Sequence, residues 1–300
     1  MASTKTILQS MEWAKKFVFQ RPLSIGDFKE PLITSANTVL QTILGKPFRW
    51  QFNRVVTGFI TTIGQQDYLL LYVWPASTTL TAGTFVIDAA GNAQKVTSPG
   101  TTNSTIPSFN GTLAGTTSDG TVTWTNMGPI PNASAAYNFG WIENASVQDP
   151  TSSKWIQISN KVDLALDAAS SRPQNIAAEL IGTLGITFRL MPVPDKAYPV
   201  AITLQQSASL ITSLNQTWAP LPDDMGYVYQ IGLLAWMFDF ADDARAGSKR
   251  QQFVAHLLGA AEGLTATEID IFLSNFNALS LSPLERQIQL QQGNQGRGAS

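Results

Sequence analysis

The residues whose spacing best suits chemistry are three aspartates near the end of the most apolar segment of the chain. Asp239, Asp242 and Asp243 stand at i, i+3 and i+4, which places three carboxylates on one face of a helix. Such a face can hold a divalent cation or supply a pair of acid groups. The same spacing is typical of a solvated helix surface, and Arg245 follows within one turn. We interpret the cluster as a surface patch.

Other side chains that catalysis needs are scarce. His256 is the only histidine and cysteine is absent, so a zinc site or a Ser-His-Asp triad is hard to assemble and no disulfide can form. Glu12 and Glu143 are available as an acid pair, but nothing in the sequence brings them together. The sequence contains neither of the glycine-rich motifs that bind nucleotides, Gly-x-x-x-x-Gly-Lys-Ser/Thr and Gly-x-Gly-x-x-Gly. We predict that the chain is not an enzyme, with no catalytic residue, no metal site and no cofactor.

The composition favours a subunit of a larger assembly. Charged residues make up 13 % of the chain, against roughly 25 % in an average soluble domain. The net charge is −2 without a basic block, so we expect no specific binding to DNA. The longest apolar run, residues 231–238, is far short of the ~20 residues of a membrane helix, and no signal peptide is recognisable. We expect synthesis in a cytoplasm and no membrane.

Helical periodicity marks both ends of the chain. Ile7, Met11, Ala14 and Val18 predict a first helix, which stops before Pro22. Residues 31–45 predict a second helix with Pro31 in its first turn and Gly45 as its C-terminal cap, and residues 249–261 predict a later one.

A long aromatic helix is expected after Met225. Its two apolar stripes are Tyr227, Ile231, Leu234 and Phe238, and Tyr229, Leu233, Trp236 and Phe240. Two stripes leave little polar surface, so the helix is either the hub of the fold or meets a neighbouring subunit. For the second case we predict a subunit interface at Tyr229, Leu233, Trp236 and Phe240.

Strand patterns fill the middle of the chain. Residues 50–53, 55–59, 65–71, 140–147 and 154–158 have strand character, and residues 186–190 with 198–205 are expected to form a hairpin. Residues 80–128 are rich in Thr, Ser, Gly and Asn, with a turn at Asp119-Gly120, and predict a small inserted β-lobe. Its aromatic residues Phe109 and Trp124 either line a sugar-binding surface or form a core, and we favour the core.

The chain ends in a segment with little apolar surface. Residues 282–300 contain three sizeable apolar side chains and a Gly/Gln-rich end, so we expect an extended tail that is disordered in isolation. We predict a docking site for a partner at Leu284, Arg286, Ile288 and Leu290. The predicted domains are a core of residues 1–79 plus 129–281, the lobe of residues 80–128 and the tail of residues 282–300.

Two stretches resemble proteins of tailed bacteriophages. The lobe resembles a module common in phage structural proteins. The residues that carry this likeness are Phe85-Val86-Ile87-Asp88, Gly91-Asn92-Ala93-Gln94-Lys95-Val96-Thr97, Gly100-Thr101-Thr102, Pro107-Ser108-Phe109 and Asp119-Gly120-Thr121-Val122-Thr123-Trp124-Thr125-Asn126-Met127-Gly128. A second region resembles the head-to-tail connectors, or portal adaptors, of short-tailed phages. Its residues are Ser171-Arg172-Pro173, Phe188-Arg189-Leu190-Met191-Pro192-Val193-Pro194-Asp195-Lys196-Ala197-Tyr198-Pro199-Val200, Gln205-Gln206, Leu210, Trp218, Leu221-Pro222-Asp223-Asp224 and the aromatic helix to Asp239 and Asp242.

The second resemblance implies an α+β fold: a bundle of N- and C-terminal helices with a β-sheet part, here with a small all-β lobe inserted. It also implies a virion protein of the head-tail junction that forms a ring of about twelve copies. That ring would join the portal protein to a tail nozzle or tail tube, with a tail fibre as a further partner, and DNA would pass through it. The docking residues Leu284, Arg286, Ile288 and Leu290 of the tail would lie at the interface with the portal. Two alternatives stay open: a tail-fibre or decoration protein that binds host glycan or a virion protein through the lobe, and a virion-associated peptidoglycan hydrolase.

Overall fold

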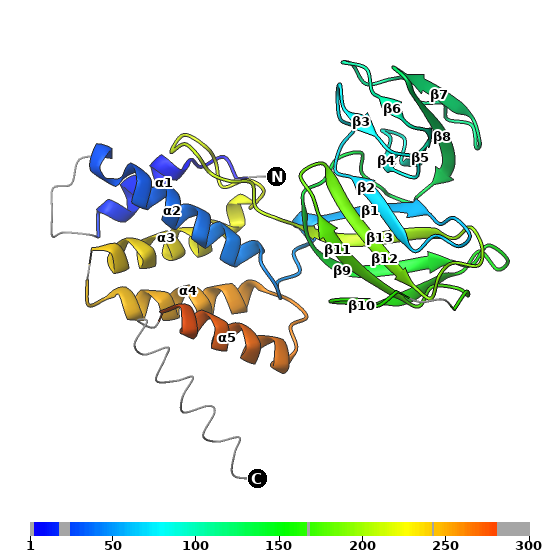
Figure 1. The fold of residues 1–300 in the computed structure, drawn as a ribbon. Coiled ribbons are helices and arrows are strands. Elements are labelled where there is room, and N and C mark those ends of the chain that lie inside the picture. Colours follow the sequence, from blue (N-terminus) through cyan, green and yellow to red (C-terminus); the bar gives the residue numbers. More distant parts are fainter. Residues whose placement is uncertain (1–2, 18–24, 167–168, 242, 281–300) are drawn as a thin grey trace, which may run out of the picture.

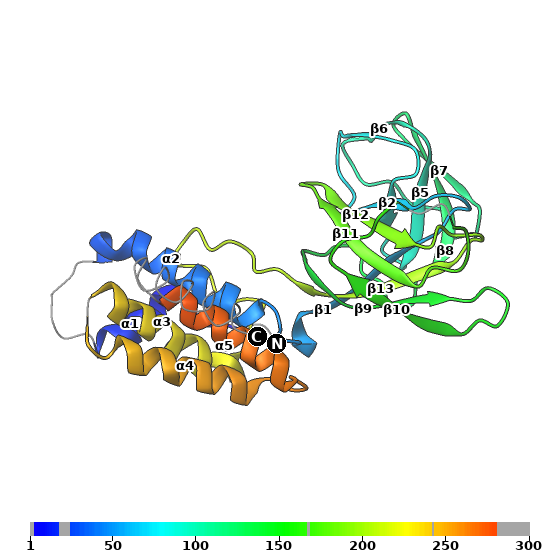
Figure 2. The same cartoon turned by 60° about the horizontal axis from the view of Figure 1, so that its bottom comes forward.

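The computed structural model describes residues 3–17, 25–166, 169–241 and 243–280. It has two parts, a group of helices and a larger β part, which lie side by side (Figures 1 and 2). The helices in the described ranges are α1 (Ile7–Lys15), α2 (Ile25–Leu44), α3 (Gly226–Phe240), α4 (Ala246–Ala260) and α5 (Ala266–Ser280). No helix in these ranges has the length and hydropathy that crossing a bilayer requires.

The expected fold class is wrong in its proportions. A helical bundle with a β-sheet part and a small lobe was predicted, whereas about 27 % of the chain is helical and the dominant element of the fold is one mixed sheet of 11 strands. The sequence understates the sheet because several strands are short and half-polar, with weak local patterns. One of them, β11 (Asn175–Ile181), was not expected at all.

The helical part is built from both ends of the chain. Helix α1 begins with a capping box in which Thr6 and Gln9 exchange side-chain and backbone hydrogen bonds. The N-terminal segment then pairs with the segment before α3, since the Ile7 N–H donates to the Gln216 carbonyl at 2.9 Å. Trp218, in the segment before α3, stacks on Tyr229 of α3 at 4.6 Å between ring centroids. The two ends of the chain therefore share one apolar core.

Helix α3 lies at the centre of this core. Ten of its 15 residues are buried, and it packs on α1, α2 and α4. At Gly232 the neighbouring helices come so close that a Cβ atom would lie 2.8 Å from Val39 and 2.9 Å from Phe253. Helix α3 is therefore the hub of the fold, which is the first of the two interpretations of its apolar stripes.

The 11-stranded sheet has the order β1-β13-β9-β10-β11-β12-β2-β4-β5-β8-β7. Its pairs are antiparallel except β10 with β11 and β2 with β4. The strands are β1 (Arg54–Ile60), β2 (Asp67–Leu71), β4 (Phe85–Ile87), β5 (Asn92–Ser98), β7 (Thr116–Asp119), β8 (Val122–Pro129), β9 (Phe139–Gln148), β10 (Trp155–Lys161), β11, β12 (Gly185–Met191) and β13 (Pro199–Gln206). The short strands β3 (Thr79–Leu80) and β6 (Gly100–Thr101) pair separately.

The sheet curls so that its first strand packs against strands far along the order. Phe59 of β1 stacks on Tyr68 of β2 at 4.4 Å between ring centroids, and Phe85 of β4 lies 6.0 Å from Phe59. These rings are fully buried in one apolar cluster with Phe188 of β12. Curling gives the sheet a closed interior without help from the helices.

Two local predictions in the β part are wrong. Strands β12 and β13 do not form a hairpin, because β12 pairs with β11 and β2, while β13 pairs with β1 and β9. Residues 51–53 form a 3-10 turn rather than a strand. Trp50, just before that turn, is held by its indole N–H, which donates to the Ile43 carbonyl at 2.6 Å.

The stretch of residues 80–128 continues the main sheet through β4, β5, β8 and β7 and also has a cluster of its own. That second cluster contains Val86, Val96, Val122 and Trp124. The Asp119 carboxylate is buried there and accepts from the indole N–H groups of Trp74 and Trp124 at 2.8 and 3.0 Å and from the Asn103 N–H at 2.8 Å. The predicted turn at Asp119-Gly120 is present, with Gly120 at φ +62°.

Helix α2 starts earlier than the sequence suggests. Its first residue is Ile25, so Pro31 is not in its first turn. The helix ends at Leu44, directly before the expected cap Gly45, where a Cβ atom would lie 2.8 Å from the Gln41 carbonyl oxygen. The end of this helix was therefore predictable, and its beginning was not.

Candidate interaction site

Two of the three aspartates singled out for chemistry are held by arginines. Asp239 at the end of α3 accepts from Arg250 of α4 at 2.6 Å. Asp243 forms an ion pair with Arg245 at 2.6 Å, and hydrogen bonds from that residue lower the pKa of Asp243 to about 2. Asp242 lies outside the described residues. Within the described ranges no group of three or more His, Cys, Asp or Glu side chains could hold a metal ion.

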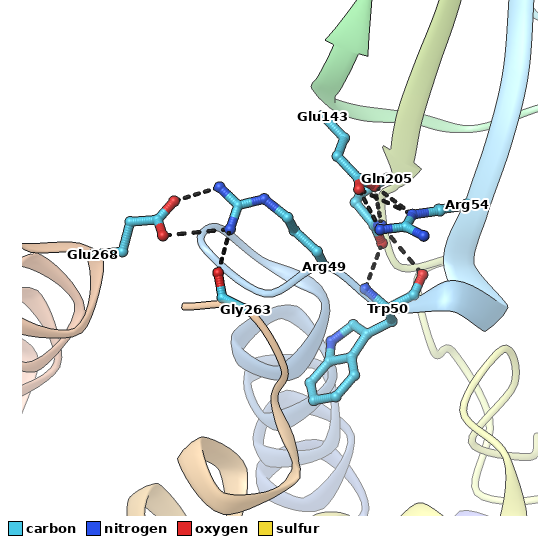
Figure 3. A network of polar contacts seen from close by, with 7 residues as sticks. All are labelled: Arg49, Trp50, Arg54, Glu143, Gln205, Gly263 and Glu268. Atoms are coloured by element: carbon cyan, nitrogen blue, oxygen red, sulfur yellow. Dashed lines mark hydrogen bonds and ion pairs between the residues drawn. The ribbon is translucent and has the colours of Figure 1, made fainter. Parts of the chain in front are cut away.

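The two glutamates considered as an acid pair belong to different parts. Glu12 is exposed on α1, whereas Glu143 is on β9 and binds Arg54 and Gln205 (Figure 3). Burial alone would raise the pKa of Glu143, but hydrogen bonds from Arg54 and Gln205 and the nearby positive charges lower it. Gln205 also exchanges two hydrogen bonds of 3.2 Å with the Trp50 backbone. The network fixes the chain where it passes from α2 into β1.

Helix α5 is tied to the same junction (Figure 3). Arg49, which precedes β1, forms an ion pair with Glu268 and has its Nη1 within 3.5 Å of the Gly263 carbonyl. The hydrogen bond from Arg49 and one from the Thr265 N–H lower the pKa of Glu268 to about 2. Helix α5 is thus positioned by charge as well as by apolar packing.

The four residues predicted for a subunit interface have different environments. Tyr229 and Leu233 are fully buried inside the chain's own helical core, and Trp236 is half-buried. Phe240 is 60 % exposed. In this fold Phe240 is therefore the member best placed to meet another protein, and the interface itself stays a prediction.

Further large apolar side chains are exposed on the helical part. Tyr227, at the start of α3, is 53 % exposed, and Ile271 of α5 is 57 % exposed. The ring of Tyr227 stands edge-on to His256 of α4, with 4.6 Å between centroids. His256 is an exposed surface residue with an aromatic neighbour, as its isolation in the sequence suggests.

The aromatic pair of the lobe is a core contact. Phe109 and Trp124 meet edge to face at 5.7 Å between centroids, and Trp124 is fully buried. A buried indole cannot stack on a sugar. The core reading of these two residues therefore fits the structure.

Helix α5 was missed at the sequence level although its start carries a signal. Thr265 and Glu268 form a capping box, in which Glu268 accepts from the Thr265 N–H at 3.0 Å and Thr265 accepts from the Glu268 N–H at 3.2 Å. Phe272 and Phe276 follow at i and i+4 and are both buried. Their spacing, read with the Thr-x-x-Glu motif, would have predicted the helix.

The predicted docking residues Leu284, Arg286, Ile288 and Leu290 lie outside the described residues. A scan against models of known protein families finds none that matches this chain, and a search of curated proteins finds no significant relative. The phage resemblance consequently rests on the residues of the chain itself.

Proposed function

We propose that this chain is a structural protein of a tailed-phage virion, an adaptor subunit that forms a ring between the portal and the tail. Its partners are further copies of itself, the portal protein and a tail nozzle or tube protein, with a tail fibre as an additional candidate. It has no enzymatic activity. DNA passes through the ring without specific binding, which suits a net charge of −2.

The observation that carries the proposal is a set of three exposed apolar side chains on the helical part. Tyr227, Phe240 and Ile271 are each more than half exposed, on a chain with only 13 % charged residues. Aromatic side chains such as Tyr227 and Phe240 are enriched in surfaces that contact another protein. The helical part also belongs to the region that resembles portal adaptors. These two facts together favour an assembled subunit over an isolated one.

A binding module is the second candidate, and the size of the β part favours it. Leu180 and Ile181 at the end of β11 and Leu184 in the turn after it are exposed, and Val162 after β10 is almost entirely exposed. Such a tip suits the recognition of another virion protein. This candidate differs from the adaptor in the part of the chain that makes the contact.

Mass measurement of the purified chain, alone and mixed with a portal protein from the same virion, separates the two candidates. An adaptor adds a ring of copies to the portal, even if the free chain is a monomer. Changing Tyr227→Ser together with Phe240→Ser should abolish the ring, whereas Ile63→Ser, at an exposed apolar position of the β part, should not. A trimer, or a chain that does not bind the portal, would contradict the proposal that the protein is an adaptor.

A further inference from the structure

A loop of the β-lobe carries the only Asn-Gly pair in the sequence, Asn110-Gly111. The pair belongs to residues 102–115, which connect β6 with β7 and contain neither helix nor strand, and both of its residues are exposed. An asparagine can react with its own main chain, because the amide nitrogen of the next residue and the side-chain carbonyl carbon together close a five-membered ring. This reaction needs an open approach, a polarised carbonyl and a leaving group that is not held in place.

The attacking nitrogen, that of Gly111, has an open approach. Glycine has no Cβ, and an atom placed there would meet nothing within 4 Å, so neither a side chain of its own nor a neighbour shields the amide. Within the described part of the chain, the Gly111 N–H donates no hydrogen bond. No native hydrogen bond is therefore lost when this nitrogen gives up its proton.

The carboxamide of Asn110 is held in a position that favours attack. Its Oδ1 accepts from the Thr112 N–H at 2.9 Å, a hydrogen bond that turns the side chain back over the peptide that follows it. A donor on this oxygen stabilises the negative charge that develops there when a nucleophile adds to the carbon. The hydrogen bonds that Asn110 makes to described residues use its N–H, its carbonyl and Oδ1, and none uses the leaving nitrogen Nδ2.

Asn110 is also anchored to the sheet of the lobe. Its N–H donates to Thr117 Oγ1 and its carbonyl accepts from Asn126 Nδ2, both at 2.8 Å. Asn126 is buried in β8. The carboxamide lies over Gly115, where a Cβ atom would come within 2.6 Å of Asn110 Cγ. The surroundings therefore hold the reactive geometry, and a chemical change at Asn110 affects the attachment of the loop to the sheet.

We propose that Asn110-Gly111 is a site of spontaneous deamidation that alters the lobe as the protein ages. The Gly111 nitrogen, after losing its proton to hydroxide, forms a bond to Asn110 Cγ, and the Cγ–Nδ2 bond breaks with release of ammonia. One water molecule then opens the cyclic imide. Opening at Cγ gives aspartate, whereas opening at the main-chain carbonyl carbon gives isoaspartate, whose main chain is one carbon longer. Water is the only co-reactant, and nothing is oxidised or reduced.

Both products change the surface of the lobe. Each adds a negative charge to an exposed loop of a chain whose net charge is −2. Isoaspartate also lengthens the main chain between the anchor at Asn110 and the turn that begins at Thr112, so the hydrogen bond from the Thr112 N–H is not retained in its present form. The reaction requires no partner protein, so this inference and the adaptor proposal can fail separately.

Peptide mapping by mass spectrometry tests the site on the full-length chain. The chain is kept warm in mildly alkaline buffer, sampled over time and digested at acidic pH, where the reaction is slow. Asn110 should be converted to aspartate and isoaspartate before the other asparagines. The exposed pair Asn103-Ser104 of the same loop should react roughly tenfold more slowly, because a side chain on the second residue hinders the attack.

Gly111→Ala is the matched variant, because its Cβ has room and Gly111 does not have a positive φ. It should keep the circular dichroism spectrum of the unaltered chain and slow the conversion of Asn110 roughly tenfold. A synthetic peptide of residues 106–116 is the positive control for the chemistry. The proposal is overturned if Asn110 reacts no faster than Asn103, if Gly111→Ala leaves the rate unchanged, or if Asn110 stays intact in the folded chain while the peptide reacts.

Discussion

Gly232 lies where α3 passes closest to its neighbours, and Gly232→Ala tests the packing of three helices at once. The added Cβ would lie 2.8 Å from Val39 Cγ1 and 2.9 Å from Phe253 Cε2. Ordinary carbon contacts are about 3.5–4.0 Å, so each overlap is about 0.6–1.2 Å. Overpacking of a core costs about 1–3 kcal/mol, and both neighbours are fully buried, which places this site in the upper half of that range.

Helix propensity acts in the opposite direction. Alanine is more stable than glycine inside a helix by about 1 kcal/mol, so the net destabilisation expected for Gly232→Ala is about 1–2 kcal/mol. Gly259→Ala in α4 is the matched control, because a Cβ there meets nothing within 4 Å. Only the propensity gain applies, and that variant should be stabilised by up to about 1 kcal/mol.

Urea unfolding followed by far-ultraviolet circular dichroism measures both free energies. The transition of the helical part is fitted separately if the two parts unfold apart. The reasoning is refuted if Gly232→Ala is as stable as the unaltered chain, or if both alanine variants shift in the same direction.

Three further predictions concern the β-lobe and the junction. Asp119→Asn cannot accept all three hydrogen bonds and should destabilise the lobe by about 2–3 kcal/mol, measured by tryptophan fluorescence in urea; an effect no larger than that of the exposed Asp270→Asn would contradict this. Because Glu268 has its pKa lowered from 4.5 to about 2 by Arg49, its contribution is complete above about pH 4.5 and is lost as the pH falls to about 2. The protection of α5 amides, taken as their exchange rate relative to an unstructured peptide at the same pH, should therefore fall over that interval, whereas Glu268→Gln should show low protection throughout. Deleting residues 80–128 removes the ring of Phe85 from the main core and should lower the melting temperature of what remains; an unchanged value would mean that the lobe folds independently.

Local chemistry was readable from the sequence where a few neighbouring residues decide the outcome. The turn at Asp119-Gly120 and the end of α2 before Gly45 follow from glycine and from short-range hydrogen bonds. The same applies to α4, whose predicted range of residues 249–261 overlaps most of Ala246–Ala260.

Strand partners were not readable, because they depend on residues distant in sequence. Residues 198–205 have the alternation of a strand, but Val200 pairs with Phe59 on one side and Val147 on the other. No local pattern distinguishes those partners from a hairpin with residues 186–190. Likewise, Tyr229 is buried because segments from both ends of the chain pack against α3. The apolar stripes of α3 do not indicate whether its neighbours come from the same chain or from another subunit.

The contact between α1 and the segment before α3 has a consequence for synthesis on the ribosome. Ser10 of α1 accepts a hydrogen bond from Trp218, which is translated 208 residues later. At about 5–20 residues per second, the first helix waits about 10–40 s for its partners. During that interval the apolar side chains of Ile7 and Met11 have no native cover, while the intervening β part can already fold. Slow or stalled translation should therefore yield chains with a native sheet and unfolded ends, which makes the nascent N-terminus the segment most in need of a chaperone.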